Sequence, residues 1–320
     1  MRERPRAGLG LALLSALAFA TSGTFARPLL DGEWSAAAVV IARVGVAALV
    51  LGVPALLALR GRWPVLRRNG VAVVLFGLLG VALAQACFYN AVQYLPVGVA
   101  LMLEYLGIVM VVGWMWLVHG QRPRLLTVAG SLTALCGLAL VLDLIGAGGL
   151  DPVGVLWGLG AGVGLAGYYV IAGRVDAELP SVVMASGGMA VGALVLLLLG
   201  AVGALPLAAG TGDVSFAGHR MSWLVPIVGL SLIAAVVAYL AGVAGARLLG
   251  ARLSSFIGLT EVMFAVLIAW LVLNELPSGI QLVGGVFIVG GVALVRMDEL
   301  RAGSESAAPA PPAPALAGER

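Results

Sequence analysis

Ten long apolar runs, separated by short polar segments, dominate the sequence. A helix rises about 1.5 Å per residue, so about 20 apolar residues cross the roughly 30 Å hydrocarbon core of a bilayer. The runs cover residues 8–26, 35–59, 70–92, 96–118, 125–143, 154–173, 181–203, 222–246, 253–273 and 279–296. They lack the alternation of a barrel strand, and lipid offers backbone groups no hydrogen-bond partner outside a helix. We therefore predict an all-α integral membrane protein with ten transmembrane helices.

The composition agrees with a chain that is solvated by lipid. Hydrophobic residues make up 62% of the 320 residues and charged residues 10%, against about 25% charged in soluble domains. The two cysteines, Cys87 and Cys136, lie within apolar runs and form no metal motif, and we expect no cofactor. All 18 basic residues are arginines scattered through loops, so no basic face for a nucleic-acid partner is expected.

The arginines also predict the topology. With the N-terminus in the cytoplasm, fifteen arginines fall in cytoplasmic segments, two fall outside, and Arg43 lies within a helix. The cytoplasmic set is Arg2, Arg4, Arg6, Arg60, Arg62, Arg67, Arg68, Arg122, Arg124, Arg174, Arg247, Arg252, Arg296, Arg301 and Arg320; the outer set is Arg27 and Arg220. Cytoplasmic loops of membrane proteins carry such an excess. We expect a multi-pass protein of the cell membrane with both termini in the cytoplasm.

The sequence repeats itself at an offset of 154 residues. Residues 112–141 then align with 266–295 without a gap, and ten of the 30 positions are identical. The identities include Trp116/Trp270, Pro123/Pro277, Gly130/Gly284 and Gly137/Gly291. Each unit contains five helices, which is an odd number, so the second unit must enter the membrane in the opposite orientation. Inverted repeats of this kind are typical of transporters, with the substrate site at the midplane between the halves.

The two units are flanked by short tails. We expect a cytoplasmic N-terminal tail over 1–7, the first five-helix repeat over 8–143 and the second over 154–296. The segment 302–320 is rich in Ala, Pro and Ser, which predicts a disordered cytoplasmic tail.

Three stretches carry a family resemblance. They are Ala-Leu-Met-Leu-Glu-Tyr-Leu-Gly at 100–107, Leu-Ser-Ser-Phe-Ile-Gly-Leu-Thr-Glu-Val at 253–262, and Asn-Glu-Leu-Pro at 274–277 before the Gly284/Gly291 helix. Together with the repeat they resemble the EamA-type ten-helix branch of the drug/metabolite transporter superfamily. The first half looks most like the threonine/homoserine-exporter group. The resemblance implies a membrane transporter of small metabolites and not an enzyme.

The chain also departs from that family. Many relatives carry proline after the glycine equivalent to Gly107 and after the glutamate equivalent to Glu261, where this chain has Ile108 and Val262. Gln121 occupies the position in the first half that Glu275 occupies in the second. We therefore expect the helices over 96–118 and 253–273 to be less broken than those of relatives.

Two glutamates are the strongest candidates for a binding site. Glu104 and Glu261 are the only carboxylates deep inside predicted spans, about 12 and 13 Å from the nearer membrane edge. A charge at that depth is costly and requires a partner, a proton or a water-filled cavity. In the repeat alignment Glu104 faces Gly258 and Glu261 faces Gly107. The glutamates are therefore predicted to face one central cavity that binds substrate and protons, although a structural, protonated glutamate is the plainer alternative.

Arg43 lies about 12 Å below the outer edge of its predicted span. At that depth it either pairs with Glu104 or binds a carboxylate of the substrate, and the sequence leaves both readings open. Other polar or aromatic side chains could line the cavity or simply join helices. These are Ser22, Gln85, Tyr89, Tyr105, Tyr169 and Tyr239.

Several other functions fit the residues poorly. An intramembrane enzyme needs paired aspartates or a Ser/His pair within spans, but the aspartates lie at span ends or beyond and His119 and His219 lie in loops. Carriers of sugar phosphates need several buried cations. Paired carboxylates with one arginine suit a zwitterionic or cationic small molecule, with protons as the coupling ion, and we expect export of amino acids or amines. A multidrug or organic-cation exporter, or a non-transporting receptor or scaffold, remain alternatives, although the longest segment between spans, 204–221, is short for a receptor module.

The topology is testable with reporter fusions after Arg68, Asp151 and Arg301. The arginine bias predicts that these report from the cytoplasm, the outside and the cytoplasm, respectively. An outside signal at Arg301 would contradict an even number of crossings.

Overall fold

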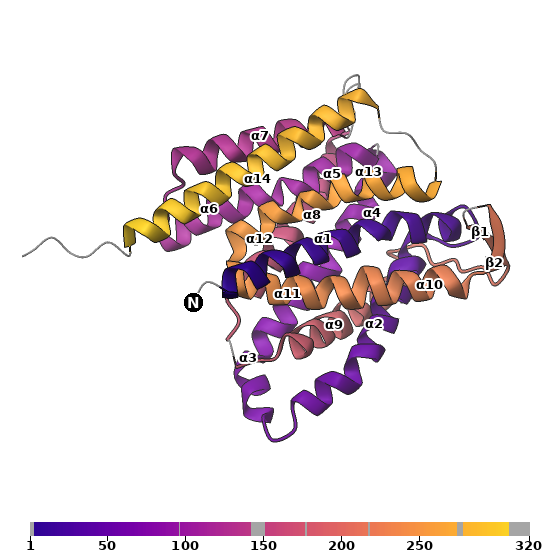
Figure 1. Cartoon of the computed structure of the whole chain (residues 1–320). Helices are drawn as coiled ribbons and strands as arrows, with labels where there is room; N and C mark the ends of the chain where they lie inside the picture. The colour runs from indigo at the N-terminus through magenta and orange to yellow at the C-terminus, as the bar shows by residue number, and fades with distance from the viewer. Residues whose placement is uncertain are drawn as a thin grey trace, which may run out of the picture.

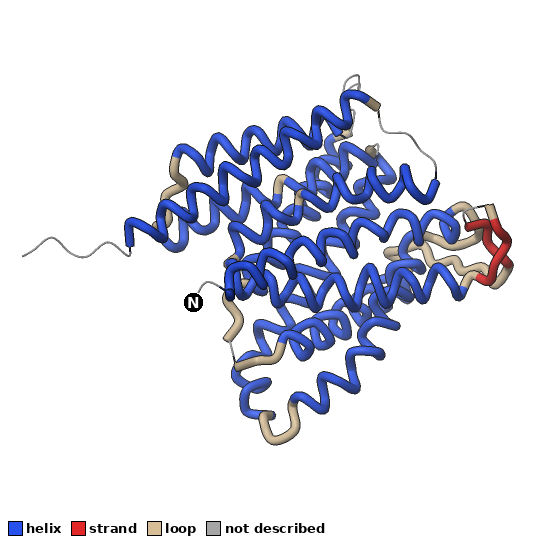
Figure 2. The backbone as a smooth tube through the Cα atoms, viewed as in Figure 1, coloured by secondary structure: helices blue, strands red, loops and turns tan. Residues whose placement is uncertain are grey.

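The computed structural model describes residues 3–95, 97–141, 151–176, 178–216, 218–273 and 278–306. Nearly all of this part of the chain is helical, and the strands form one small hairpin at an end of the bundle (Figure 2). Glu275 and Pro277, which the sequence places at a helix end and in a turn, lie outside the described residues. The protein is thus all-α in its membrane part, as predicted.

The first repeat contains seven α-helices and a π-helical segment. They are α1 (Glu3–Leu30), α2 (Ala36–Ala58), α3 (Trp63–Leu75), the π-helix η1 (Phe76–Leu83), α4 (Ala84–Tyr94), α5 (Val97–Tyr105), α6 (Gly107–His119) and α7 (Leu125–Val141).

The second repeat has the same order with a hairpin added. Its elements are α8 (Pro152–Ala172), α9 (Ser181–Ala201), β1 (Asp213–Phe216), β2 (His219–Ser222), α10 (Leu224–Ser231), the π-helix η2 (Leu232–Val237), α11 (Ala238–Leu249), α12 (Ala251–Gly258), α13 (Thr260–Leu273) and α14 (Gly279–Ser306).

Eight helices in the described part of the chain are long and apolar enough to cross a membrane. Two shorter apolar helices, Leu125–Leu140 and Leu282–Val295, occupy the positions of the predicted fifth and tenth spans. The multi-pass character of the chain follows from the eight long helices, and the count of ten stays a prediction.

Both ends of the helical region extend further than the sequence suggested. Helix α1 begins at Glu3, inside the expected tail 1–7, and runs through Pro28 to Leu30. Helix α14 continues to Ser306 and therefore overlaps the first five residues of the predicted tail 302–320. Apolarity marks only the part of a helix that lies in lipid, whereas Ala, Glu and Arg allow the helix to continue into water.

The hairpin was not anticipated. Strands β1 and β2 pair antiparallel, with Asp213 opposite Ser222 and Phe216 opposite His219. The Phe216 ring stacks on Phe25 of α1 at 5.8 Å between ring centroids. The hairpin therefore packs against the end of α1, and all of it except Ser222 lies within the segment 204–221 between predicted spans.

The two halves share the same irregularities. Shifted by the repeat offset of 154 residues, η2 falls on residues 78–83, inside η1. The next helix of each half is interrupted for a single residue, at Leu106 between α5 and α6 and at Leu259 between α12 and α13. The Leu106 amide still donates to the Met102 carbonyl at 3.1 Å, so the break in the first half is slight. The repeat detected in the sequence is therefore also a repeat of backbone distortions.

The orientation of the halves follows from the contact between α7 and α14, which lie side by side (Figure 1). A Cβ atom on Gly130 would lie 2.7 Å from the Gly291 carbonyl oxygen, and one on Gly137 would lie 2.6 Å from that of Gly284. The first glycine of α7 (Gly130) thus faces the second glycine of α14 (Gly291), and the second of α7 (Gly137) faces the first of α14 (Gly284). The two helices are therefore antiparallel. Because they are the same element of each repeat, the repeats run in opposite directions.

Contacts between loops agree with a chain that alternates between two ends of the bundle. Three contacts join segments that were predicted to be cytoplasmic: Arg68 with Glu178 at 2.5 Å, Arg174 with His119, and Arg247 with the Leu179 carbonyl. The Ser35 amide donates to the Ala208 carbonyl at 2.9 Å between two segments that were predicted to be outside. The beginning of α1 and the end of α14 lie at the same end of the bundle (Figure 1).

The close glycine contacts predict a specific sensitivity. Gly130→Ala and Gly137→Ala should each destabilise the protein by about 1–3 kcal/mol, because a methyl group would push the α7 and α14 backbones apart. Gly113→Ala on α6 is the matched control, since nothing lies within 4 Å of its added Cβ. Thermal unfolding in detergent measures the effect, and equal melting temperatures for all three variants would contradict this packing.

Candidate functional site

The structure places each deep glutamate beside the helical interruption of its own repeat. Glu104 lies near the end of α5, two residues before the interruption at Leu106, and Glu261 lies in the first turn of α13, two residues after the interruption at Leu259. Both side chains are only half-buried. The helical interruptions of the two repeats thus place one carboxylate each in a shared central region.

Tyrosines surround these carboxylates. Of the six tyrosines in the chain, five lie in the central cluster, on α4, α5, α8 and α11: Tyr89, Tyr105, Tyr168, Tyr169 and Tyr239. Tyr105 directly follows Glu104 on α5 and is buried. The four tyrosines predicted to line a cavity are therefore all neighbours of the glutamates, and Tyr168 joins them.

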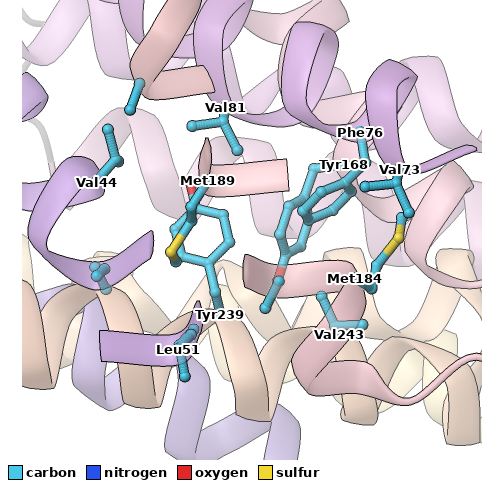
Figure 3. Packing of buried hydrophobic residues seen from close by; sticks show 14 of the residues in the cluster. Val44, Leu51, Val73, Phe76, Val81, Tyr168, Met184, Met189, Tyr239 and Val243 are labelled. Carbon is cyan, nitrogen blue, oxygen red and sulfur yellow. The ribbon is translucent and has the colours of Figure 1, made fainter. Parts of the chain in front are cut away.

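The rings form a packed aromatic cluster. Tyr168 lies 4.9 Å from Tyr169 and 5.7 Å from Tyr239 between ring centroids, both nearly edge to face. Phe76, the first residue of η1, packs 5.2 Å from Tyr168, and Phe19 of α1 packs 5.1 Å from Tyr239. Figure 3 shows Phe76, Tyr168 and Tyr239 among the buried aliphatic side chains. The two phenylalanines were missed because nothing in an apolar run distinguishes them from lipid-facing residues.

Glycines occupy the positions that are equivalent to the glutamates in the other repeat. A Cβ on Gly258 would overlap the Tyr169 hydroxyl, and one on Gly107 would overlap the Gly162 carbonyl oxygen of α8. Any side chain there would displace a neighbour in the centre of the bundle. Close packing therefore accounts for glycine at position 107 of the first repeat and at position 258 of the second, where the other repeat has a glutamate.

Arg43 is buried, with 7% of its surface exposed, but it does not pair with either glutamate in the described part of the chain. Its guanidinium group donates to the Ala234 carbonyl, which belongs to η2, and its Cζ lies 5.6 Å from the Phe19 ring centroid. A π-helical segment disturbs the regular hydrogen bonds of a helix, and the guanidinium group supplies a donor to one of its carbonyls. Arg43 still interacts electrostatically with Glu261.

The remaining predicted residues are placed less centrally. The Ser22 hydroxyl is buried, with no hydrogen-bond partner among the described residues. Gln85 is half-buried on α4, and the structure gives it no contact with the glutamates. Ser15, one of the polar residues of the first span, donates to the Ala238 carbonyl at 2.8 Å and therefore joins α1 to α11.

Two apolar hollows lie away from this cluster. Their volumes are about 590 and 390 Å³, and both are bounded by Met263 and Phe264 of α13 and Val289 of α14. Their walls carry no charged side chain. They suit hydrocarbon, whereas the glutamate and tyrosine cluster suits a polar or charged group.

A multi-pass helical protein built from two inverted repeats, with ionisable groups between them, has the architecture of a membrane transporter. The chain belongs to the EamA-like transporter family, whose model matches residues 6–143 and 152–297. This membership makes the protein a transporter of the drug/metabolite type and not an enzyme.

One of two further comparisons, with a solved structure, agrees with the fold. A protein of known crystal structure matches with a TM-score of 0.68 and 23% identity, over 94% of this chain and 99% of the other. A UPF0060 membrane protein of Aeromonas hydrophila subsp. hydrophila is 55% identical over 29 residues, which are 9% of this chain and 26% of that protein. The chain therefore matches only about a quarter of that relative's length.

The bond from Arg43 to Ala234 predicts a loss of stability in Arg43→Leu. Leucine cannot donate to the buried carbonyl, and a buried acceptor without a partner costs about 1–3 kcal/mol. Arg43→Lys should also be less stable than wild type, because an ammonium group lacks the planar fork of donors. Arg220→Leu in the exposed strand β2 serves as the control for charge removal. A wild-type melting temperature in Arg43→Leu would show that the bond contributes nothing.

Proposed function

We propose that the protein is a secondary active transporter that exports small amines or amino acids in exchange for protons. One observation carries the proposal: Glu104 and Glu261, one from each inverted repeat, each lie two residues from the helical interruption of their repeat, in a protein whose interior holds a packed cluster of tyrosines. No such group of ionisable residues is needed to hold an apolar bundle together.

The inverted repeats support alternating access. Two halves of the same fold in opposite orientations can exchange conformations, which opens the centre first to one side and then to the other. The interruptions at Leu106 and Leu259 lie two residues from the glutamates. A change of backbone conformation at these interruptions would therefore move the two carboxylates directly.

The pair of carboxylates supports exchange with protons. Poor solvation and a nearby like charge both favour the neutral form of a carboxyl group. A proton and a cationic amine then compete for the same two groups. Binding of one releases the other, and an inward proton gradient would drive export of the amine.

The aromatic cluster supports a cationic group on the substrate. Ammonium groups bind favourably over the faces of aromatic rings as well as beside carboxylates. A multidrug exporter for organic cations shares these requirements, whereas a non-transporting receptor or scaffold gives no reason for two inverted repeats that each carry one deep glutamate. Substrate-dependent flux distinguishes a transporter from a receptor.

The same proposal includes the orientation in the cell membrane. We assign the arginine-rich end, where Arg68, Arg174 and Arg247 make their contacts, to the cytoplasm, together with both termini.

Glutamine at either glutamate tests the mechanism. Glu104→Gln and Glu261→Gln should each reduce amine-driven proton flux in proteoliposomes at least tenfold, because an amide resembles the protonated acid but releases no proton. In the wild type, binding of an amine should weaken as the pH falls, since protons then occupy the carboxylates; in the variants this dependence should disappear.

The matched control is Glu33→Gln, at an exposed glutamate between α1 and α2. It should keep wild-type flux and wild-type pH dependence. If both variants of the central glutamates also keep the wild-type pH dependence, the exchange mechanism is wrong and these glutamates are structural.

A further inference from the structure

We propose that Arg43, Ser22 and Ser231 form a subsite for the carboxylate of the substrate, which makes the substrate an amino acid and not a simple amine. The inference rests on the proposed function, because it adds a second subsite to the glutamate and tyrosine cluster. Ser231 was not singled out by the sequence.

The three residues carry buried polar atoms that the rest of the described chain leaves without a partner. These atoms are Nε of Arg43 and the hydroxyl oxygens of Ser22 and Ser231. Ser231 is fully buried, and Arg43 is 7% exposed. Buried polar groups in proteins are almost always hydrogen-bonded, so a group of unpaired ones requires an explanation such as a missing ligand.

The packing of α1 against the helix formed by α10, η2 and α11 brings the two serines together. Ser15 bonds to the Ala238 carbonyl near one end of this contact, and Phe25 meets Gly229 near the other, so the helices are antiparallel. Between these two contacts, residue numbers rise along α1 while they fall along the neighbouring helix. Ser22 and Ser231 therefore lie at the same level of the two helices.

Arg43 reaches the same place from α2. It contacts Phe19, which lies one turn before Ser22 on α1, and Ala234, which lies one turn after Ser231. The two serines thus lie on the same side of the guanidinium group, about one helical turn away along both helices. Arg43, Ser22 and Ser231 therefore lie at a similar level of the bundle on three different helices.

The chemistry of these donors fits a carboxylate. A carboxylate accepts several hydrogen bonds through its two oxygens, and a guanidinium N–H and two hydroxyls can supply them. One positive charge balances one carboxylate. Because part of the guanidinium group is already held by Ala234, the subsite is too weakly charged for a phosphate group.

Tyr239 joins this subsite to the glutamates. It packs against Phe19, whose ring centroid lies 5.6 Å from Cζ of Arg43, and against Tyr168 of the tyrosine cluster. An amino acid carries its ammonium and carboxylate groups on a single carbon. Its ammonium group can therefore bind at the glutamates while its carboxylate binds at the subsite. A simple amine would leave the three donors unpaired.

Matched pairs of ligands test the subsite on the purified full chain. The pairs are leucine and isoamylamine, phenylalanine and phenethylamine, and lysine and cadaverine, which differ only in the carboxylate. Wild-type protein should bind at least one amino acid about tenfold more tightly than its amine. Ser22→Ala and Ser231→Ala should each weaken that binding about tenfold and leave the binding of the amine unchanged.

The control is Ser131→Ala on α7, whose hydroxyl donates to the Thr127 carbonyl of its own helix. The ligand-free Ser22→Ala and Ser231→Ala proteins should melt at or above the wild-type temperature, since each loses a buried group without a partner. A purely structural role for these serines would instead lower the melting temperature.

The outcomes separate the two proposals. Equal affinity for amine and amino acid, with no effect of the serine variants, would overturn the carboxylate subsite while the proposed amine–proton exchange stands. Failure of all six ligands to bind would overturn both.

Discussion

A backbone carbonyl in lipid has no partner except within its own helix, and this constraint decides where the chain can depart from regular structure. The departures are few and paired: η1 with η2, and the interruption at Leu106 with that at Leu259. They are tolerated because neighbouring helices supply the hydrogen-bond donors that lipid lacks, as Arg43 does for the Ala234 carbonyl. Irregular backbone in a membrane protein therefore marks the interior, and here it lies beside Glu104 and Glu261, the carboxylates deepest in the predicted spans.

Much of this arrangement could be read from the sequence, because apolar length, arginine placement and the repeat each have a direct physical cause. Glu104 and Glu261 could be found from the cost of burying a charge, and their proximity from the repeat. Phe19, Phe76 and Ser231 could not be found, since their importance depends on which face of a helix turns inward. The π-helical segments and the hairpin likewise arise from tertiary contacts that no local pattern records.

The two halves are alike in backbone but not in chemistry. At the repeat offset, the position of Arg43 is occupied in the second half by Leu197, and each glutamate is matched by a glycine. The centre of the protein is therefore polar in an asymmetric way, although the helices around it are symmetric. A symmetric frame can exchange conformations between its halves, while an asymmetric centre can hold a ligand in one orientation.

The crossed glycines of α7 and α14 have a consequence of their own. Gly130 meets Gly291 and Gly137 meets Gly284, so interchanging the two repeats turns each contact into the other. This is the self-complementary geometry of a homodimer interface, contained within one chain. Such an interface looks the same from both halves in whichever direction the centre is open. In the proposed exchange cycle the α7–α14 contact therefore needs no rearrangement, because both states of the centre present it with the same geometry.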